Sequence, residues 1–284
     1  MLGDTIDLLS CPHCGADLTL DRGVVRCASG HRFDVARQGY VSLLASGARI
    51  DTADTAAMVQ ARQTFLVEGH YAPMVEAVAD ACQSVVDAGG DGCIADLGAG
   101  TGYHLAGVLA RLPERRGLAL DNSKHALRRA ARAHPRIGAV ACDVWGELPV
   151  RADAAIAVLS IFSPRNPSEI ARVLKADGGL VVLAPTDRHL QELIPALGLL
   201  SVDDHKQERL EARLSSRFVA VEQRAVEYEL ALSHDAIGAL VAMGPSARHI
   251  SGEQLAERIS ALPDQVMATA SVRVVIYRQR SASG

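Results

Sequence analysis

The chain has 284 residues, of which 49% are hydrophobic and 22% charged, and its formal net charge is −4. This composition excludes a wholly disordered chain, and the weak negative charge excludes a globally basic nucleic-acid-binding protein. The apolar run over 179–184 stops at Pro185, far short of the ~20 residues that span a bilayer. Residues 1–11 carry no basic side chain, so a signal peptide is not expected. We therefore expect a soluble, cytoplasmic protein with no membrane partner.

Helical periodicity over 50–69 and 73–88 precedes a region, 93–184, in which short apolar runs alternate with helical stretches. Apolar runs of that length, separated by helices, are typical of a parallel sheet covered on both faces. The last third differs, because 217–232 and 272–278 favour long strands. Together these patterns predict an α/β protein built on a doubly wound parallel sheet.

Four residues near the N-terminus have the spacing of a metal site: Cys11, Cys14, Cys27 and His31. Two ligands on one tight turn, a short hairpin and two more ligands on a second turn can close a tetrahedron around a zinc ion. Four protein ligands leave no position open for water, so the predicted site is structural. His13 is the alternative fourth ligand, and a redox CxxC pair is the alternative function. The other cysteines lie in apolar contexts and are expected in the core: Cys82, Cys93 and Cys142.

A glycine-rich turn follows the apolar run 93–97 and precedes a helical pattern. Gly98, Gly100 and Gly102 stand at alternate positions in it, where glycine lets the backbone approach a ligand closely and adopt positive φ. Asp121 ends the next predicted strand, nineteen residues beyond Gly102, where a carboxylate can accept hydrogen bonds from both ribose hydroxyls. These features predict a nucleoside-containing ligand. A doubly wound domain whose loop binds nothing is the alternative.

Two details favour S-adenosylmethionine over NAD as that ligand. The spacing Gly98-x-Gly100-x-Gly102 is tighter than the dinucleotide pattern G-x-G-x-x-G, and Asp96 stands just before the loop. A carboxylate at that position would repel a pyrophosphate, whereas it suits a sulfonium and an amino group. Asp143 ends the following predicted strand and places a third acid at the same edge of the sheet.

Longer motifs extend along nearly the whole chain. They occupy residues 11–14, 31–41, 69–73, 143–145, 163–167 and 241–246. Through them the chain resembles the RlmA-type 23S rRNA (guanine-N1)-methyltransferases, and within these the TlrB-like tylosin- and mycinamicin-resistance branch. The runs 31–41 and 69–71 are the specific part of the match, since cysteine knuckles and glycine loops are generic.

The resemblance implies a class I, Rossmann-like, S-adenosylmethionine-dependent methyltransferase with an N-terminal zinc-binding module. It divides the chain into a zinc-binding RNA-recognition module over 1–46 and a methyltransferase domain over 47–284. The implied reaction is methylation of N1 of a guanine, guanine 748, in a 23S rRNA hairpin loop, which would confer resistance to tylosin- and mycinamicin-type macrolides. The expected partner is that hairpin, and a homodimer is left open.

The resemblance also implies further residues of the cofactor pocket. In the family this pocket is lined by the residues that match Tyr71, His104, Leu105 and His189, and Asp143 matches the adenine contact.

The catalytic group is left open by the sequence. Guanine N1 carries a proton at neutral pH, so methyl transfer needs a base or a polarised O6. Asn166 follows the fourth predicted strand of the domain, where its amide could hydrogen-bond a guanine edge, and Asp143 or His189 could serve as the base. A tight turn fixed by Pro164 and Pro167 is the alternative interpretation of the segment around Asn166.

A basic stretch over 111–136 offers a path for RNA. It holds eight Lys or Arg against two acids, a surplus that could follow a phosphate backbone. A solvated helix face is the alternative interpretation. Two other functions also stay open at this point: a small-molecule methyltransferase of an antibiotic pathway, which would need no zinc module, and a non-catalytic RNA-binding protein.

Overall fold

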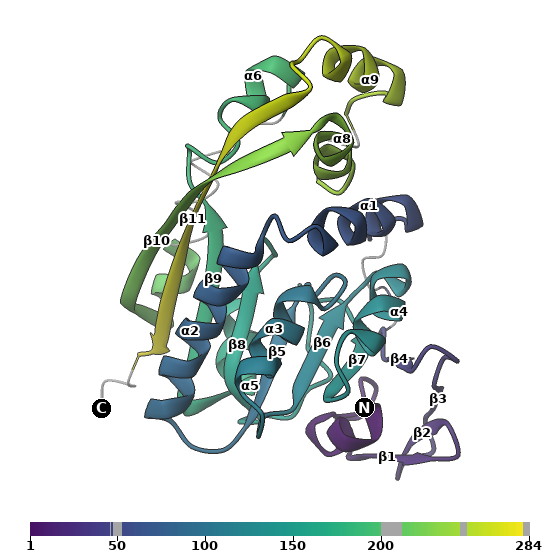
Figure 1. Cartoon of the computed structure of the whole chain (residues 1–284). Helices are drawn as coiled ribbons and strands as arrows, with labels where there is room; N and C mark the ends of the chain where they lie inside the picture. The colour runs from purple at the N-terminus through teal and green to yellow at the C-terminus, as the bar shows by residue number, and fades with distance from the viewer. Residues whose placement is uncertain (46, 48–52, 200–211, 245–248, 281–284) are drawn as a thin grey trace.

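The computed structural model describes residues 1–284 except 46, 48–52, 200–211, 245–248 and 281–284 (Figure 1). The strands are β1 (Leu18–Asp21), β2 (Val24–Cys27), β3 (Arg32–Asp34), β4 (Tyr40–Ser42), β5 (Cys93–Leu97), β6 (Gly117–Asp121), β7 (Ile137–Ala141), β8 (Ala155–Ile161), β9 (Leu174–Pro185), β10 (Phe218–Ser233) and β11 (Gln265–Gln279). The helices are η1 (Leu2–Leu8), α1 (Ala56–Val67), α2 (Ala72–Ala88), α3 (Tyr103–Arg111), α4 (Lys124–Ala133), α5 (Pro167–Val173), α6 (Leu193–Leu197), α8 (His234–Ala242) and α9 (Gly252–Ser260).

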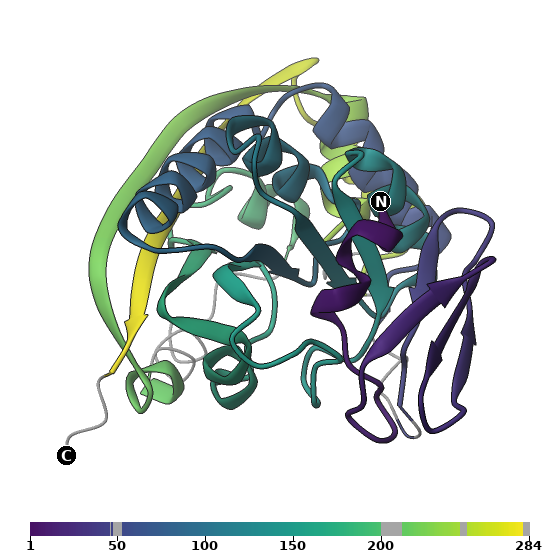
Figure 2. The same cartoon turned by 90° about the horizontal axis from the view of Figure 1, so that it is seen from below.

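The larger of the two sheets has eight strands in the order β10-β11-β9-β8-β5-β6-β7-β4. Neighbours from β9 to β4 are parallel, whereas β11 and β10 add an antiparallel pair at the other end. Every residue of β5, β6, β7 and β8 is buried, because α2, α3 and α4 cover one face and α5 lies on the other (Figures 1 and 2). The prediction of a parallel sheet covered on both faces is confirmed.

The antiparallel pair β10 and β11, which is connected through α8 and α9, extends beyond the other strands of the sheet, with α6, α8 and α9 beside its far end (Figure 1). The strand predicted over 272–278 in fact begins at Gln265. Residues 272–277 pair with both β9 and β10, whereas the earlier part pairs with β10 alone and is more exposed. Residues 265–271 therefore do not form the continuous apolar run that predicts a buried strand, and the sequence pattern missed them. Among the described helices, none has the length and apolar character needed to cross a membrane.

The N-terminal part shares a core with the main sheet. β4 pairs in parallel with β7, and a Cβ atom at Gly138 of β7 would lie 2.0 Å from the hydroxyl oxygen of Thr5 in η1. Leu9, Val41 and Leu43 are buried in the same apolar cluster as side chains of β6 and β7. The small sheet β1-β2-β3 lies at this end of the molecule, opposite β10 and β11 (Figure 2). A division of the chain after residue 46 would therefore cut through one core.

The carboxyl ends of the parallel strands meet at one edge of the sheet, and α1 lies across it (Figure 1). α1 packs against α8, and Arg62 of α1 donates a hydrogen bond of 2.9 Å to the carbonyl oxygen of Met243 at the end of α8. The hydroxyl of Ser123, just after β6, donates to the carbonyl of Asp54 ahead of α1. This is the edge at which open α/β sheets bind their ligands.

Candidate functional site

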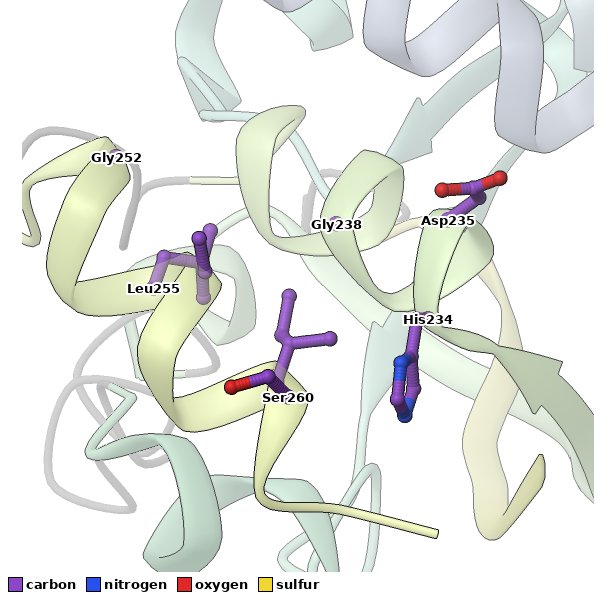
Figure 3. A pocket seen from close by; sticks show the side chains of 8 residues that line it. His234, Asp235, Gly238, Gly252, Leu255 and Ser260 are labelled. Carbon is purple, nitrogen blue, oxygen red and sulfur yellow. The ribbon is translucent and has the colours of Figure 1, made fainter. Parts of the chain in front are cut away.

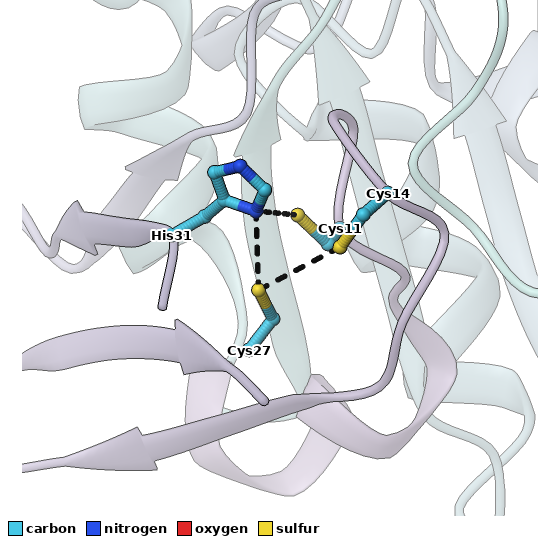
Figure 4. A group of neighbouring side chains, drawn as sticks. All are labelled: Cys11, Cys14, Cys27 and His31. Atoms are coloured by element: carbon cyan, nitrogen blue, oxygen red, sulfur yellow. Dashed lines mark hydrogen bonds between the residues drawn. The ribbon is translucent and has the colours of Figure 1, made fainter. Parts of the chain in front are cut away.

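The four residues predicted as metal ligands lie together, with their ligand atoms all within 4.8 Å of one another (Figure 4). The Sγ atoms of Cys14 and Cys27 are 3.7 Å apart, and His31 Nδ1 lies 3.5 Å from Cys11 Sγ and 3.3 Å from Cys27 Sγ. Zinc–thiolate bonds of about 2.3 Å place two sulfurs of a tetrahedron about 3.8 Å apart. The donor set and its spacing therefore fit a zinc ion.

Local backbone geometry places these ligands. Gly15 follows the first knuckle with a φ of +69°, and its N–H donates to the carbonyl of Cys11 at 2.8 Å. Gly30 repeats the arrangement in the second knuckle, with a φ of +88° and a 3.1 Å hydrogen bond to the carbonyl of Cys27. His13, the alternative ligand, stands outside the cluster, and its ring stacks on Phe33 at a centroid distance of 5.8 Å.

The glycine loop after β5 has left-handed backbone at each of its three glycines, with φ values of +73°, +55° and +78° at Gly98, Gly100 and Gly102. The Asp121 carboxylate accepts hydrogen bonds from the backbone N–H of Gly100 at 2.8 Å and of Ser123 at 2.7 Å. It thereby holds the loop and the start of α4 in one arrangement. The predicted pair of glycine loop and acid is thus assembled at the carboxyl edge.

Two buried polar groups at this edge lack a partner among the described residues. Asp96 is 2% exposed and its Oδ1 accepts no hydrogen bond, and the Nδ1 of His104 is likewise unpaired. Burial, together with the charge of Asp121, raises the pKa of Asp96 to about 8, whereas burial and the nearby Arg62 lower the pKa of His104 to about 4. Unpaired buried polar atoms are costly, so this geometry suits a ligand that brings a cation and hydrogen bonds.

The first turn of α3 contributes backbone groups. The side chain of Leu105 is fully buried in the core, so its backbone N–H is the only group it can offer a ligand. N–H groups in the first turn of a helix have no acceptor within the helix, and they favour negative charge. The segment after Gly102 therefore presents donors toward the loop.

An aromatic cluster lies at the same edge: Tyr71, Phe162 and His189. The ring of His189 is stacked on that of Phe162 at 6.0 Å between centroids, and Tyr71 lies 6.3 Å from each. The Nδ1 of His189 accepts a 3.2 Å hydrogen bond from the backbone N–H of Ser271, which leaves the ring proton on Nε2. Burial lowers the pKa of His189 to about 4, so at neutral pH the ring is uncharged and its Nε2–H is a hydrogen-bond donor.

Phe162 was not predicted as a site residue. It opens the segment 162–167 that the family resemblance assigns to the target base, but nothing in the sequence distinguishes it within that segment. Its left-handed backbone, with a φ of +49°, is set by tertiary structure and not by residue type.

The two candidate catalytic residues hold neighbouring loops. Asp143 Oδ1 accepts a hydrogen bond from the backbone N–H of Trp145 at 2.9 Å. Asn166 caps α5 through its Oδ1, and its Nδ2 donates to the carbonyl of Trp145 at 2.9 Å. Both side chains therefore position the loop around Trp145, whose own side chain is exposed.

The basic stretch 111–136 divides into two groups. Four arginines are engaged within the fold: Arg111 pairs with Asp80, Arg115 with Asp91 and Arg116 with Asp7, while Arg136 donates to carbonyls of residues 109, 112 and 115. The other four lie exposed on α4 and form no ion pair with any described residue: Lys124, Arg128, Arg129 and Arg132. Within this stretch, the α4 basic face is the group whose charges no ion pair with a described residue engages.

Two surface pockets accompany these features. A pocket of 340 Å³ between α1, α3 and α4 is lined by Thr101, Tyr103, Arg129 and Arg132, so it joins the glycine loop to the α4 basic face. A pocket of 360 Å³ lies between α8 and α9, where His234 and Leu255 face it (Figure 3). None of the predicted site residues lines the second pocket.

Family models match two segments of the chain. Residues 9–47 match the model described as RlmA, N-terminal, and residues 94–178 match a methyltransferase domain. The first segment contains all four residues of the metal cluster, and the second contains the glycine loop.

Relatives extend the match to nearly the full length. A 23S rRNA (guanine(748)-N(1))-methyltransferase of Streptomyces fradiae is 48% identical, over 98% of this chain and 99% of the relative. A candidate 23S rRNA (guanine-N(1)-)-methyltransferase of Micromonospora griseorubida is 47% identical, over 97% and 98%. Among solved structures, a candidate methyltransferase from Bacillus halodurans has a TM-score of 0.50 at 13% identity, covering 72% of this chain and 99% of its own, which supports the fold alone.

Proposed function

This chain belongs to the family of 23S rRNA (guanine-N1)-methyltransferases, and on that premise we propose that it methylates N1 of a guanine in 23S rRNA. The observation that carries the proposal is the presence, on one core, of a four-ligand metal cluster and a sheet edge with an unpaired buried acid. A small-molecule methyltransferase would need only the second of these.

S-adenosylmethionine, the cofactor of this class of methyltransferase, supplies the methyl group from its sulfonium. We assign its pocket to Tyr71, Asp96, Gly98, Gly100, Gly102, His104, Leu105, Asp121, Asp143 and His189. In this assignment Asp121 accepts the ribose hydroxyls and Asp143 lies beside the adenine. The unpaired carboxylate of Asp96 faces the positive charge of the ligand, which explains how a carboxyl that is costly to bury is stabilised.

The chain's part in the chemistry is to orient the guanine and to manage its N1 proton. Because His189 is a neutral donor through Nε2, we assign it hydrogen bonding and not proton removal. Asp143 is the alternative carboxylate for accepting the proton, a role that would exclude the adenine contact assigned to it above. The Nδ2 of Asn166 already donates to the carbonyls of Trp145 and Gly146, so its proposed part is to position the loop that would carry the guanine edge.

RNA binding is assigned to two adjoining surfaces. The metal cluster would hold a structural zinc ion that fixes the two knuckles of the RNA-recognition module over 1–46, which shares a core with the methyltransferase domain over 47–284. A Cβ atom at Gly39 would lie 3.7 Å from Ala131 of α4, so the module lies directly beside the α4 basic face. Phosphate groups of one RNA segment could therefore contact both surfaces.

Finer features of the function follow the named activity of the Streptomyces fradiae relative. We propose guanine 748, in a hairpin loop of 23S rRNA, as the target, and protection of the ribosome from tylosin- and mycinamicin-type macrolides as the consequence. A cytoplasmic location follows from that substrate. A homodimer is proposed as the assembly that would present two such surfaces.

Primer extension tests the proposal directly, because a methyl group on N1 blocks Watson–Crick pairing and stops the polymerase. Purified protein and S-adenosylmethionine are incubated with a 23S hairpin and with a 16S fragment of similar length. A stop one nucleotide before a single guanine of the 23S hairpin is expected. Methyl incorporation without any stop would contradict transfer to N1.

A further inference from the structure

Phe162 combines a strained backbone with an exposed aromatic ring. It directly follows β8 at the carboxyl edge, with a φ of +49° and 45% of its surface exposed. Non-glycine residues with left-handed backbone cost free energy, and they cluster at functional sites where the strain is part of the mechanism. An exposed phenylalanine also lacks the favourable free energy that burial of its apolar surface would contribute.

The position of the ring is fixed by the chain around it. The N–H of Phe162 donates to the carbonyl of Leu183 at 3.1 Å, which continues the ladder between β8 and β9. The Ser160 hydroxyl lies 3.1 Å from that of Ser163 and accepts a 3.0 Å hydrogen bond from the Nε of Arg165. Residues on both sides of Phe162 are therefore tied to β8, which holds its backbone in place, while Tyr71 and His189 lie beside its ring.

The surroundings of the ring leave an open surface next to the cofactor loop. His189 and Tyr71 lie within 6.3 Å of it, and the plane of His189 is inclined by only 28° to that of Phe162. Ser163, the residue after Phe162, lies against the glycine loop, because a Cβ atom at Gly98 would come within 2.8 Å of the Cβ of Ser163. Phe162 thus joins the aromatic cluster to Ser163, which is the residue that contacts the glycine loop.

We propose that Phe162 is the stacking platform for the target guanine, an inference that rests on the proposed function. A base extruded from its loop loses its stacking neighbours, and an aromatic side chain replaces them. Stacking on Phe162 would cover the exposed ring and seat the purine beside the cofactor loop. The ring of His189 is stacked on Phe162, so its Nε2–H would be a donor near the same purine.

Trp145 supplies a matched control. It is the other strongly exposed large aromatic residue among those described, at 40%, but its ring has no contact with the aromatic cluster. The two residues therefore distinguish a general need for exposed aromatic surface from a need for one fixed ring.

The test compares Phe162→Leu, Phe162→Tyr and Trp145→Leu in the full chain. Phe162→Leu keeps an apolar side chain and the same backbone strain but has no aromatic face. Its kcat/KM on the 23S hairpin is expected to fall by roughly 5- to 150-fold, the range typical of one lost base–aromatic stack. Phe162→Tyr should stay within about threefold of the unmodified protein, and Trp145→Leu, on the loop held by Asp143 and Asn166, should lose less activity than Phe162→Leu. S-adenosylhomocysteine affinity, measured by calorimetry, should be unchanged in all three.

Three results would overturn the inference. Activity of Phe162→Leu equal to that of the unmodified protein would show that no stack is lost. An equal defect in Phe162→Tyr would show that the position needs packing and not an aromatic face. A fall in the S-adenosylhomocysteine affinity of Phe162→Leu as large as its fall in activity would show that Phe162 lines the cofactor pocket. Failure of the unmodified protein to methylate the hairpin would instead contradict the proposed function, and this inference with it.

Discussion

The metal cluster and the carboxyl edge are built by different means. The four cluster residues lie within 21 residues of sequence, and their ligand atoms converge on one point. The carboxyl edge draws on residues from Tyr71 to Ser271, and it contains buried atoms that converge on no partner in the described chain. Local spacing therefore suffices to predict the first site, whereas the second depends on the order of strands in the sheet.

The two sites are joined through one core, so a truncation cannot separate them. Since β4 and η1 share a core with β6 and β7, removing residues 1–46 would strip an edge strand and expose apolar side chains such as Val140. A truncation would therefore confuse loss of RNA binding with loss of folding. Point substitutions separate the two sites more cleanly.

Cys27→Ser should have the largest effect. Exchanging a soft thiolate for a hydroxyl removes one of four ligands, and structural zinc sites contribute about 10–16 kcal/mol in apparent binding free energy. Zinc should fall from one per chain to near zero after dialysis, and Tm should fall because the knuckles adjoin the shared core. Elemental analysis measures the first effect. Cys82→Ala, at a buried cysteine outside the cluster, should keep its zinc. Stoichiometric zinc in Cys27→Ser would refute the ligand assignment.

Asp121→Ala should follow in size. Its carboxylate holds the N–H groups of Gly100 and Ser123, and each hydrogen bond to a charged group contributes about 1.5–3 kcal/mol. S-adenosylhomocysteine affinity should fall at least tenfold in calorimetry, because both the loop and the proposed ribose contact are lost. Glu114→Ala, at an exposed acid outside the edge, should bind normally. Unchanged affinity of the Asp121 variant would place the ribose elsewhere.

Asp96 should make cofactor binding depend on pH. Burial raises the pKa of this carboxyl to about 8, so it is protonated in the free protein at pH 6. S-adenosylmethionine is cationic and favours the carboxylate form of Asp96, so its binding should release a proton. Its affinity should therefore rise by up to about tenfold per pH unit between pH 6 and 7.5. Calorimetry in buffers of different ionisation enthalpy measures the released proton. Asp96→Asn should remove the dependence, and a slope equal to that of the unmodified protein would exclude Asp96 as its source.

The same shift has a consequence for folding. A carboxyl whose folded pKa lies above its unfolded value contributes stability that is fully present below about pH 4 and is lost as the pH rises toward 8. Without ligand, the stability of Asp96→Asn relative to the unmodified protein should therefore be greater at pH 8 than at pH 5. Thermal unfolding of both proteins at the two pH values measures this difference.

Much of this architecture is predictable from the sequence because its signals are local. Buried strands appear as apolar runs, and the glycine loop and metal knuckles appear as fixed spacings. The aromatic cluster is different, since Tyr71, Phe162 and His189 come from three distant segments. Only the family resemblance pointed to Tyr71 and His189 as members of one site. The division of the basic stretch was equally hidden, because its acidic partners, such as Asp7 and Asp80, lie outside it.

The α4 basic face gives the smallest expected effect. A substitution there should change folding stability and RNA affinity in opposite directions. Lys124, Arg128 and Arg132 stand four residues apart on α4, so like charges face one another along the helix. Such pairs destabilise a helix by about 0.2–0.5 kcal/mol each, a cost that a bound polyanion would offset. Arg128→Gln should therefore raise the free energy of unfolding by a few tenths of a kcal/mol while it weakens RNA binding.

Salt dependence shows whether the lost contact was to phosphate. Each lost contact should reduce the slope of log affinity for the hairpin against log salt by about 0.7–0.9. Arg111→Gln, at an equally basic position already paired with Asp80, should leave the slope unchanged. Arg111→Gln and Arg128→Gln could instead reduce the slope equally. That result would show that an arginine already paired with a carboxylate contacts RNA as readily as an arginine of the α4 basic face. The α4 basic face would then be no more than part of a diffuse positive surface.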